Sequence, residues 1–316
     1  MIRVVDNLVE SIQEKQSPIV VGLDTTYENV PLEIKSKYNQ DLGGAADAIL
    51  EFNMHVIDAV SDVVPAIKPQ TAFFELYGWS GIRAFEETVA YAKSKRLIVI
   101  EDAKRGDIGS TSEAYANAHL GTIKIGNTSY SNSEIDFMTV SPFLGLDSLE
   151  PFIRVSRENN KGLFILVRTS NPGSSFTQTA MTKKGITVAE ELAEYIASNA
   201  DNCRGNSGYS SIGAVVGATY PEEAIRLRAL MKDAFFLVPG YGFQGGTAKD
   251  AVPFFNRDGL GALISSSRNI IYAYKNKYQQ TSCSIDELIT STRSAAQNMR
   301  EEIYSAIKKT YSNISY

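Results

Sequence analysis

Eight short apolar runs alternate with amphipathic stretches along the 316-residue chain. The runs are rich in β-branched and aromatic residues and are apolar throughout, which is typical of strands buried on both faces of a parallel sheet. They lie at residues 19–24, 66–70, 97–104, 137–142, 162–170, 211–219, 235–242 and 261–267. Because each run is followed by a helical pattern, the chain predicts a closed (β/α)8 barrel, an α/β fold of TIM-barrel type.

The stretches between the runs carry the apolar spacing of helices. The clearest lie at 81–95, 146–159, 188–200 and 221–232, and a last helix is predicted over 284–309. An apolar stripe near the N-terminus predicts one extra helix; it consists of Val5, Leu8, Val9 and Ile12. Polar segments near 122–135 and 171–187 are interpreted as loop insertions and not as linkers. Residues 1–316 are therefore expected to form a single barrel domain.

Composition narrows the partners. The net charge of −5 argues against a nucleic-acid or anionic-membrane surface as the main partner. No run approaches the roughly 18 apolar residues of a membrane span. The N-terminal stretch lacks the apolar centre of a signal peptide. The sequence therefore predicts a cytoplasmic protein.

Histidine and cysteine are scarce, which limits the chemistry. The two cysteines, Cys203 and Cys283, provide neither a disulfide framework nor a zinc-binding spacing. The two histidines, His55 and His119, lie within helical patterns and are expected to be structural and far from the charged motif described next. A Ser-His-Asp triad or a histidine-based metal site is thus disfavoured. Any catalysis is expected to depend on carboxylates and lysines.

Five charges lie within seven residues directly after the apolar stretch Leu97–Ile100 of the third run, in the sequence EDAKRGD. Residues two apart in a strand share a face, so Asp102 and Lys104 should continue the face of Ile98 and Ile100. Catalytic groups of such barrels stand at the carboxyl ends of strands. The charges are therefore expected at the mouth of the barrel. The alternative is a plain Asp102–Lys104 ion pair at its rim.

Two neighbouring strands also end in charged residues, Asp24 and Lys68. Both side chains should converge on Asp102 and Lys104. Two carboxylates beside two ammonium groups form an alternating array that can keep a lysine protonated and ready to deliver its proton.

The segment after this motif has a structural interpretation as well. Ser110 to Glu113 read STSE, the pattern of a capping box, which favours Ser110 as the N-cap of the next helix. Asp107 could help to start that helix or could be functional, and the spacing alone leaves both interpretations open.

The loop PGYGFQGG, residues 239–246, contains a G-x-G-x-x-G match at Gly240, Gly242 and Gly245. A dinucleotide site would require an acidic residue at the end of the next strand, where this chain has Arg268 instead. The loops after strands seven and eight are where barrels commonly bind phosphate. We therefore favour a phosphate site formed by the glycine loop and Arg268 over a plain glycine-rich turn beside a surface arginine.

Taken together, these motifs resemble the orotidine 5′-phosphate decarboxylase family, most closely its longer bacterial-type branch. The resemblance covers most of the chain, in order: GLD, IKP, DAKRGDIGST, SNPGS, PGYGFQGG and SSSR. It implies a homodimeric barrel that converts orotidine 5′-monophosphate (OMP) to uridine 5′-monophosphate (UMP) and carbon dioxide, in the last step of pyrimidine synthesis. It also implies that neither a metal nor an organic cofactor is used.

The resemblance implies roles for the charged motif. Lys104 would protonate C6 of the pyrimidine as carbon dioxide leaves, and Asp102 would face the departing carboxylate. Lys68 would organise the array and contact the ribose. Three residues would reach into the partner subunit's site: Asp107, Ile108 and Thr111.

It also implies the substrate-binding residues. Asp24 would bind a ribose hydroxyl and Ser170 the pyrimidine ring. Gln244 and Arg268 would hold the phosphate. The loop that closes over the phosphate would contribute Pro239 and Gly245.

Two other functions are compatible with parts of the sequence. One is a magnesium-dependent sugar-phosphate decarboxylase or aldolase on a related barrel, against which the Arg105–Gly106 pair and Gln244 argue. The other is a catalytically silent nucleotide-phosphate binding protein. The intact set of charged residues argues against it: Lys68, Asp102, Lys104 and Asp107.

Overall fold

Eight parallel strands close into a barrel in the computed structural model, in the order β1-β2-β3-β6-β7-β8-β9-β10. The strands are β1 (Ile19–Leu23), β2 (Ala66–Pro69), β3 (Ile98–Arg105), β6 (Phe137–Val140), β7 (Gly162–Arg168), β8 (Ser210–Val216), β9 (Ala234–Val238) and β10 (Ala262–Ser266). Each predicted run overlaps one of them, so the predicted (β/α)8 fold is confirmed. The structure describes residues 2–242, 247–278, 283–311 and 314.

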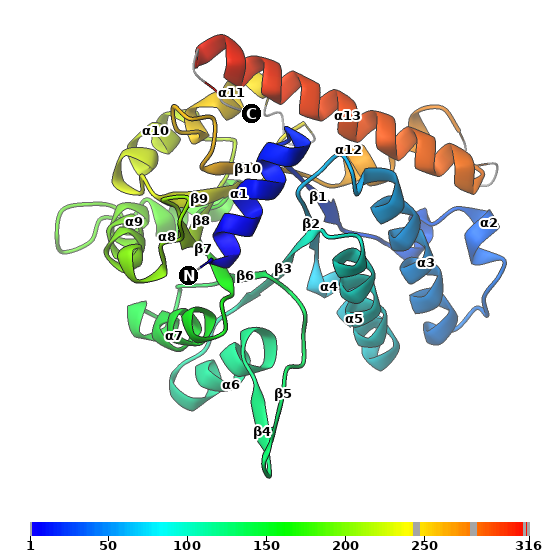
Figure 1. Cartoon of the computed structure of the whole chain (residues 1–316), viewed down its shortest axis with the longest axis horizontal. Helices are drawn as coiled ribbons and strands as arrows, with labels where there is room; N and C mark the ends of the chain where they lie inside the picture. The colour runs from blue at the N-terminus through cyan, green and yellow to red at the C-terminus, as the bar shows by residue number, and fades with distance from the viewer. Residues whose placement is uncertain (1, 243–246, 279–282, 312–313, 315–316) are drawn as a thin grey trace.

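Helices surround the barrel and bury one apolar face each against it (Figure 1). The longer ones are α3 (Leu42–Val60), α5 (Gly78–Ser94), α6 (Gly109–Leu120), α7 (Glu150–Glu158), α9 (Val188–Asn199), α10 (Pro221–Leu230) and α13 (Ile285–Thr310). Short elements fill the connections: η1 (Tyr27–Asn29), α2 (Leu32–Lys35), α4 (Thr71–Glu75), η2 (Leu146–Leu149), η3 (Pro172–Ser174), α8 (Ser175–Gln178), η4 (Asp201–Cys203), α11 (Ala248–Ala251), η5 (Val252–Phe254), α12 (Arg268–Ile271) and η6 (Ala273–Asn276).

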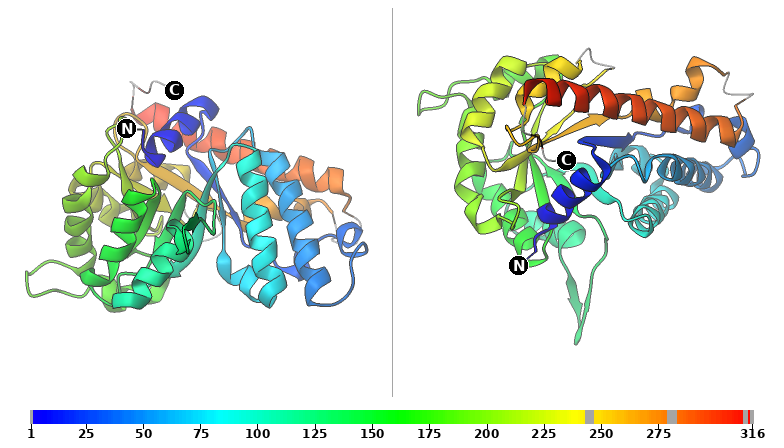
Figure 2. Two further views of the ribbon diagram at one scale, coloured as in Figure 1. Left: turned by 60° about the horizontal axis from the view of Figure 1, so that its bottom comes forward. Right: turned by 45° about the horizontal axis from the view of Figure 1, so that its top comes forward.

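The predicted N-terminal helix, α1 (Val4–Lys15), lies across one end of the barrel (Figures 1 and 2). Its buried stripe packs into the same cluster as the side chains that fill the barrel interior, among them Phe137 and Phe164. The centroids of these two rings are 5.3 Å apart. Full burial of such side chains stabilises the fold by about 1.5–3 kcal/mol each. Because α1 closes the amino-terminal end, access to the barrel interior is left at the carboxyl ends of the strands.

The segment near 122–135 is not a plain loop, and the prediction was wrong on this point. It forms an antiparallel hairpin of β4 (Ile123–Ile125) and β5 (Thr128–Tyr130), which projects from the body of the molecule (Figures 1 and 2). Gly126, with φ 60°, provides the tight turn. The second insertion, near 171–187, contains η3 and α8 and ends in a bridge between Met181 and Thr187.

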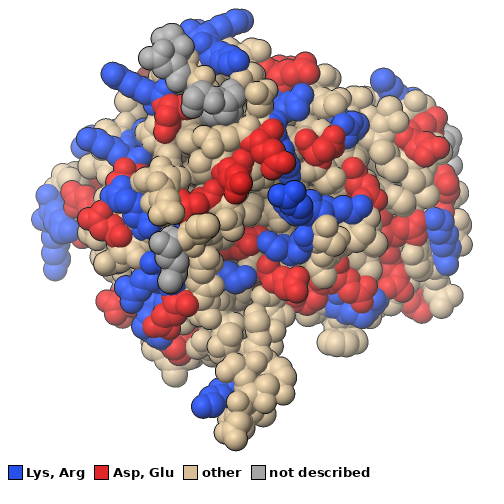
Figure 3. Space-filling model, viewed as in Figure 1, with Lys and Arg blue, Asp and Glu red and all other residues tan. Residues whose placement is uncertain are grey.

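Basic and acidic side chains are interspersed on the face seen in Figure 3, so this face carries no continuous patch of one sign. No helix in the described part of the chain is long and apolar enough to cross a membrane.

Candidate active site

Asp102 lies at the centre of a hydrogen-bond network at the carboxyl end of β3. Its Oδ2 accepts hydrogen bonds from Lys68 Nζ at 2.7 Å and from Gln70 Nε2 at 3.1 Å. Its Oδ1 accepts from Lys104 Nζ at 2.5 Å and from Thr139 Oγ1 at 3.0 Å. Although Asp102 is only 7% exposed, both carboxylate oxygens are fully engaged, which offsets the cost of burying the charge.

The electrostatics of the network keep its groups ionised. Burial alone would raise the pKa of Asp102, but the charges of Lys68 and Lys104 outweigh it and hold that pKa well below its usual range. Burial alone would lower the pKa of Lys68, whereas the carboxylates of Asp102 and Asp24 raise it above its ordinary value. The predicted convergence is confirmed for Lys68, Asp102 and Lys104, because both lysines are hydrogen-bonded to Asp102, and the charge of Asp24 acts on Lys68.

Lys104 is placed by a bulge in β3. The β3–β6 ladder shifts register so that the residues between Glu101 and Arg105 face Thr139. Lys104 has φ 49°, in the left-handed region that a residue other than glycine adopts at a cost of roughly 1–3 kcal/mol. Its backbone N donates to Thr139 Oγ1 at 2.9 Å, which fixes this conformation.

Asp24 follows β1 on the same side of the barrel. Its Oδ1 is buried and has no hydrogen-bond partner among the described residues. Gly22 leaves room for it, because a Cβ there would lie 3.3 Å from this oxygen and 2.9 Å from Ser267 Cβ. An unpartnered buried carboxylate oxygen beside Lys68 can accept a hydrogen bond from a bound hydroxyl group.

The residues after the motif connect β3 to α6. Asp107 Oδ1 accepts a hydrogen bond from Ile108 N at 2.8 Å, and in the described part of the chain it is not bonded to the array. Ile108 is 58% exposed, and Thr111 is exposed as well. The prediction that Ser110 caps α6 was wrong, because Ile108 is the N-cap residue and makes no side-chain cap. The helix starts two residues earlier than the STSE pattern suggests.

The prediction that His119 lies far from the charged motif was wrong. Its Nδ1 is 2.8 Å from Oε2 of Glu101, the first charge of that motif. Glu101 points to the outer side of β3, where Thr71 Oγ1 also donates to it at 3.2 Å. The helical histidine is structural, as expected, but it anchors α6 to β3 directly behind Asp102.

The loops after β7, β8 and β9 are bonded to one another. Ser170, in the first loop, accepts a hydrogen bond on its carbonyl oxygen from Thr219 Oγ1 at 3.4 Å. Pro239, in the third, accepts from Ala218 N at 2.9 Å. The predicted residues Ser170 and Pro239 therefore border one continuous rim.

Arg268 begins α12 directly after β10 and is exposed. The glycine loop approaches it closely, because a Cβ on Gly242 (φ 71°) would lie 2.4 Å from Asn269 Nδ2. The two features expected to hold a phosphate thus come together. Two of the predicted phosphate-binding residues, Gln244 and Gly245, lie outside the described residues.

Two residues of the network were missed from the sequence, Gln70 and Thr139. Each had a signal. Gln70 stands two residues beyond Lys68, at the end of the same strand, and Thr139 is a polar residue inside an otherwise apolar run. A buried threonine next to a charged strand end is a candidate partner for that charge.

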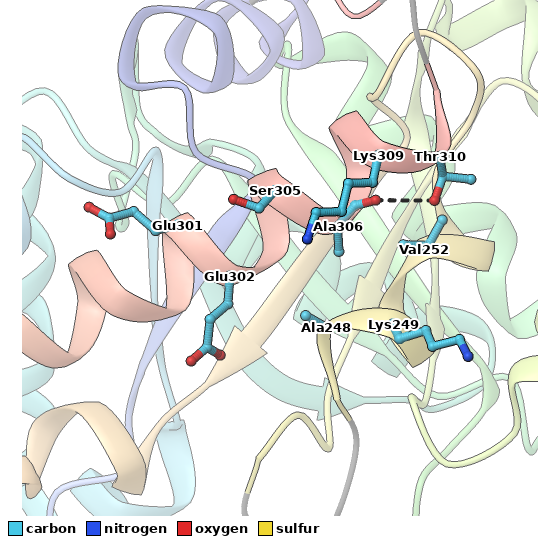
Figure 4. Close-up of a pocket in the computed structure, with 9 residues that line it drawn as sticks. All are labelled: Ala248, Lys249, Val252, Glu301, Glu302, Ser305, Ala306, Lys309 and Thr310. Carbon is cyan, nitrogen blue, oxygen red and sulfur yellow. Dashed lines mark hydrogen bonds between the residues drawn. The ribbon is translucent and has the colours of Figure 1, made fainter.

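A separate cavity of about 660 Å³ lies between α11 and α13 (Figure 4). Glu302 and Lys309 of α13 and Lys249 of α11 line it. It contains none of the predicted site residues. In the described part of the chain, no group of three or more His, Cys, Asp or Glu residues could hold a metal ion.

The fold and the site define a (β/α)8-barrel enzyme with alternating lysine and carboxylate charges at the carboxyl ends of its strands. The model of the Orotidine 5′-phosphate decarboxylase / HUMPS family matches residues 17–280. The chain belongs to this family, and the predicted family and carboxy-lyase class are confirmed.

Individual relatives agree over nearly the whole chain. Orotidine 5′-phosphate decarboxylase of Clostridium acetobutylicum is 43% identical over 300 residues, which cover 95% of this chain and 98% of that protein. The protein of the same name from Caldicellulosiruptor bescii is 39% identical over 311 residues, with 97% and 100% covered. The solved structure of Leishmania donovani OMP decarboxylase is similar with a TM-score of 0.72 and 29% identity, over 97% of this chain and 99% of that one.

Proposed function

We propose that this chain decarboxylates OMP to UMP and carbon dioxide at the mouth of the barrel, with residues 1–316 acting as one domain. The observation that carries the proposal is the Asp102 carboxylate held between two ammonium groups, Lys68 at 2.7 Å and Lys104 at 2.5 Å. Relatives that are 39% and 43% identical over nearly the whole chain bear the name of this activity.

The chemistry requires fixed positive charge. The bond between C6 of the pyrimidine and the carboxylate carbon breaks, the electron pair stays on C6 and carbon dioxide leaves. No neighbouring atom takes up that pair, so a preorganised cation has to stabilise it. The Lys104 side chain is 44% exposed, against 8% for Lys68, and is thus the lysine assigned to C6 of the pyrimidine. Its ammonium group then transfers a proton to C6, which gives UMP, and the lysine regains a proton from solvent.

The other charges orient the reaction. Asp102 faces the departing carboxylate, while Lys68 holds Asp102 in place and contacts the ribose. Asp24, with its unpartnered buried oxygen, accepts a hydrogen bond from a ribose hydroxyl. Ser170 contacts the pyrimidine ring.

The phosphate is bound at the far side of the mouth. Arg268 and Gln244 hold it, and Pro239 and Gly245 belong to the loop beside it. Binding energy gained at the phosphate, away from the reacting carbon, contributes to the transition state when the loop closes.

We further propose that the enzyme is a homodimer in which Asp107, Ile108 and Thr111 enter the partner's site. The exposure of Ile108 and Thr111 supports this arrangement, as does the apolar surface of Phe143 and Leu144 in the loop after β6, 76% and 50% exposed. We also propose that the enzyme is cytoplasmic. The net charge of −5 argues against a nucleic-acid or anionic-membrane partner.

A turnover assay tests the proposal. The purified chain, treated exhaustively with EDTA, is incubated with OMP, and UMP and carbon dioxide are quantified. Equal amounts of both products are expected, because each OMP gives one UMP and one carbon dioxide. EDTA should leave the activity unchanged, because the lysines supply the positive charge that a metal ion would otherwise provide. Activity that appears only after magnesium is added would favour the sugar-phosphate enzyme. Tight UMP binding without any turnover would favour the silent binding protein.

A further inference from the structure

Arg168, the last residue of β7, is a buried cation that the proposed chemistry does not use. It is 2% exposed. Its Nε donates to Glu223 Oε2 at 2.7 Å and its Nη2 to Glu223 Oε1 at 3.2 Å, while Nη1 is bonded to Ser174 Oγ. The guanidinium carbon lies 3.7 Å from the centroid of the Tyr220 ring. Its two edges and one face are therefore all engaged.

The partners of Arg168 belong to two different loops at the mouth. Ser174 ends η3 in the loop after β7, whereas Tyr220 and Glu223 lie at the start of α10, after β8. The carbonyl oxygen of Arg168 also accepts a hydrogen bond from Gly217 N at 2.6 Å. Arg168 thus joins the ends of two adjacent strands and the loops that follow them.

Ser170 is enclosed by these contacts. A Cβ on Gly217 would lie 2.8 Å from Ser170 Cα, so the two loops touch at this residue. On its other side, Thr169 N donates to Gln178 Oε1 at 2.9 Å, which ties the loop to α8. The position of Ser170 is consequently set by the loops that Arg168 joins.

Burying an arginine costs free energy, because its charge is taken out of water. A well-packed apolar residue often stabilises such a site at least as well as an ion pair does. What the guanidinium adds is a single geometry, because a bidentate carboxylate, a hydroxyl group and an aromatic face must all match its plane. The β7–β8 ladder also shifts register between Leu166 and Arg168, the kind of irregularity that re-aims a side chain beside an active site.

We propose that Arg168 is a positioning residue for recognition of the pyrimidine base. It does not touch the substrate but holds the loop after β7 so that Ser170 meets the ring. The inference rests on the proposed function, in which Ser170 binds the ring. It assigns Arg168 to the base and not to the phosphate or the ribose.

The test compares two ligands that differ by the base. UMP and ribose 5-phosphate are titrated by calorimetry into the wild-type protein and into Arg168→Gln. Because a misplaced loop can cost about 100-fold, UMP binding should weaken by roughly 10- to 100-fold, while ribose 5-phosphate should bind within about twofold of wild type. The value of kcat/KM for OMP should fall in step with UMP affinity.

Two further variants keep the test decisive. Glu223→Gln is the milder change, because the altered side chain is 41% exposed, and it should shift the two affinities in the same unequal way. Arg226→Gln is the matched control. Arg226 lies on the same helix α10 as Glu223 but pairs with Glu190 of α9, so its loss should change neither affinity.

Equal losses for both ligands, or unchanged UMP binding in the folded Arg168 and Glu223 variants, would overturn the inference. An absence of OMP turnover in the wild-type chain would contradict the proposed function instead, and this is measured separately from the ratio of the two affinities.

Discussion

At the scale of single residues, the site depends on one carboxylate that serves two lysines. Asp102 is buried with Lys68, which is 8% exposed, while Lys104 remains 44% exposed on its other side. The buried lysine compensates the carboxylate in the interior. Asp102 can therefore stay ionised and at the same time hold the exposed Lys104 at the mouth of the barrel. The different exposure of the two lysines leads to the first prediction.

Lys104→Ala should lower kcat for OMP by at least about a hundredfold, because the variant loses both the cation opposite C6 and the proton donor. UMP affinity should stay close to wild type, since phosphate and ribose contacts lie elsewhere. A turnover assay measures kcat, and calorimetry measures the affinity for UMP. Lys124→Ala, on the exposed hairpin, is the matched lysine control. More than a few per cent of residual activity in Lys104→Ala would remove this lysine from the mechanism.

Arg268→Ala should weaken UMP binding by roughly 10- to 100-fold and uridine binding far less, because a charge-assisted bidentate contact needs a phosphate to accept it. Parallel titrations of UMP and uridine check this. Similar losses for the nucleotide and the nucleoside would assign Arg268 a structural role at the start of α12.

The residues that the sequence placed correctly are those whose position follows from strand alternation. Ile98, Ile100 and Asp102 share one face of β3, as their spacing predicts. Lys104 reaches the array for another reason, because a bulge and a positive φ turn it back onto Asp102. A bulge depends on the neighbouring strand, here on Thr139. The residues next to Lys104 in the sequence therefore do not predict it.

At the scale of the elements, the apolar runs and the helical stripes predicted the barrel because each is a local pattern. The hairpin of β4 and β5 was missed, since its six residues are all exposed and carry no apolar run that marks a buried strand. Likewise, α6 starts without a side-chain cap, so the STSE pattern misplaced its beginning. Apolar patterns in the sequence predict buried elements best, because burial requires apolar residues at regular positions.

The contact between α5, α6 and β3 holds a second cluster of charges behind the site. Burial, and next the charge of Glu101 on β3, raise the pKa of Glu86 on α5 to about 7. His119 on α6 and Ser133 act in the opposite direction, and Glu134, just before β6, adds to the increase. The pKa of Glu86 is near 4.5 in the unfolded chain and about 7 in the folded chain. At pH values between these two, the folded chain thus binds a proton that the unfolded chain releases.

Glu86 therefore favours the folded state at acidic pH, and this advantage disappears as pH rises through about 7. Glu86→Gln should make the free energy of unfolding less dependent on pH between about 5 and 8.5, with a relative gain of about 1–2 kcal/mol at the alkaline end, after allowance for partial exposure. Urea unfolding across this range measures it. Glu87→Gln, an exposed neighbour paired with Arg83, is the control and should follow the wild-type slope. The same slope in Glu86→Gln would contradict the assignment.

At the scale of the whole molecule, α1 closes one end of the barrel, so the site opens only at the other. At this mouth Asp107 is half-buried and Ile108 is exposed, and Asp107 is not bonded to the array of its own chain in the described structure. If a second copy covers the mouth across a two-fold axis, each pocket combines Lys104 of one subunit with Asp107 of the other. A homodimer of either Lys104→Ala or Asp107→Ala then has two defective pockets.

A mixed dimer of the two variants should recover activity, because both lesions fall into one pocket and the other pocket keeps a full set of residues. If subunits exchange at random from equal amounts, half of the dimers are mixed, and activity should approach roughly a quarter of wild type. The two proteins are mixed under mildly dissociating conditions, returned to native buffer and assayed with OMP, after mass spectrometry of intact dimers has verified the exchange. A mixture of Lys104→Ala with Lys104→Ala/Asp107→Ala is the control and should stay inactive. Verified mixed dimers without recovery would place Asp107 in the pocket of its own chain.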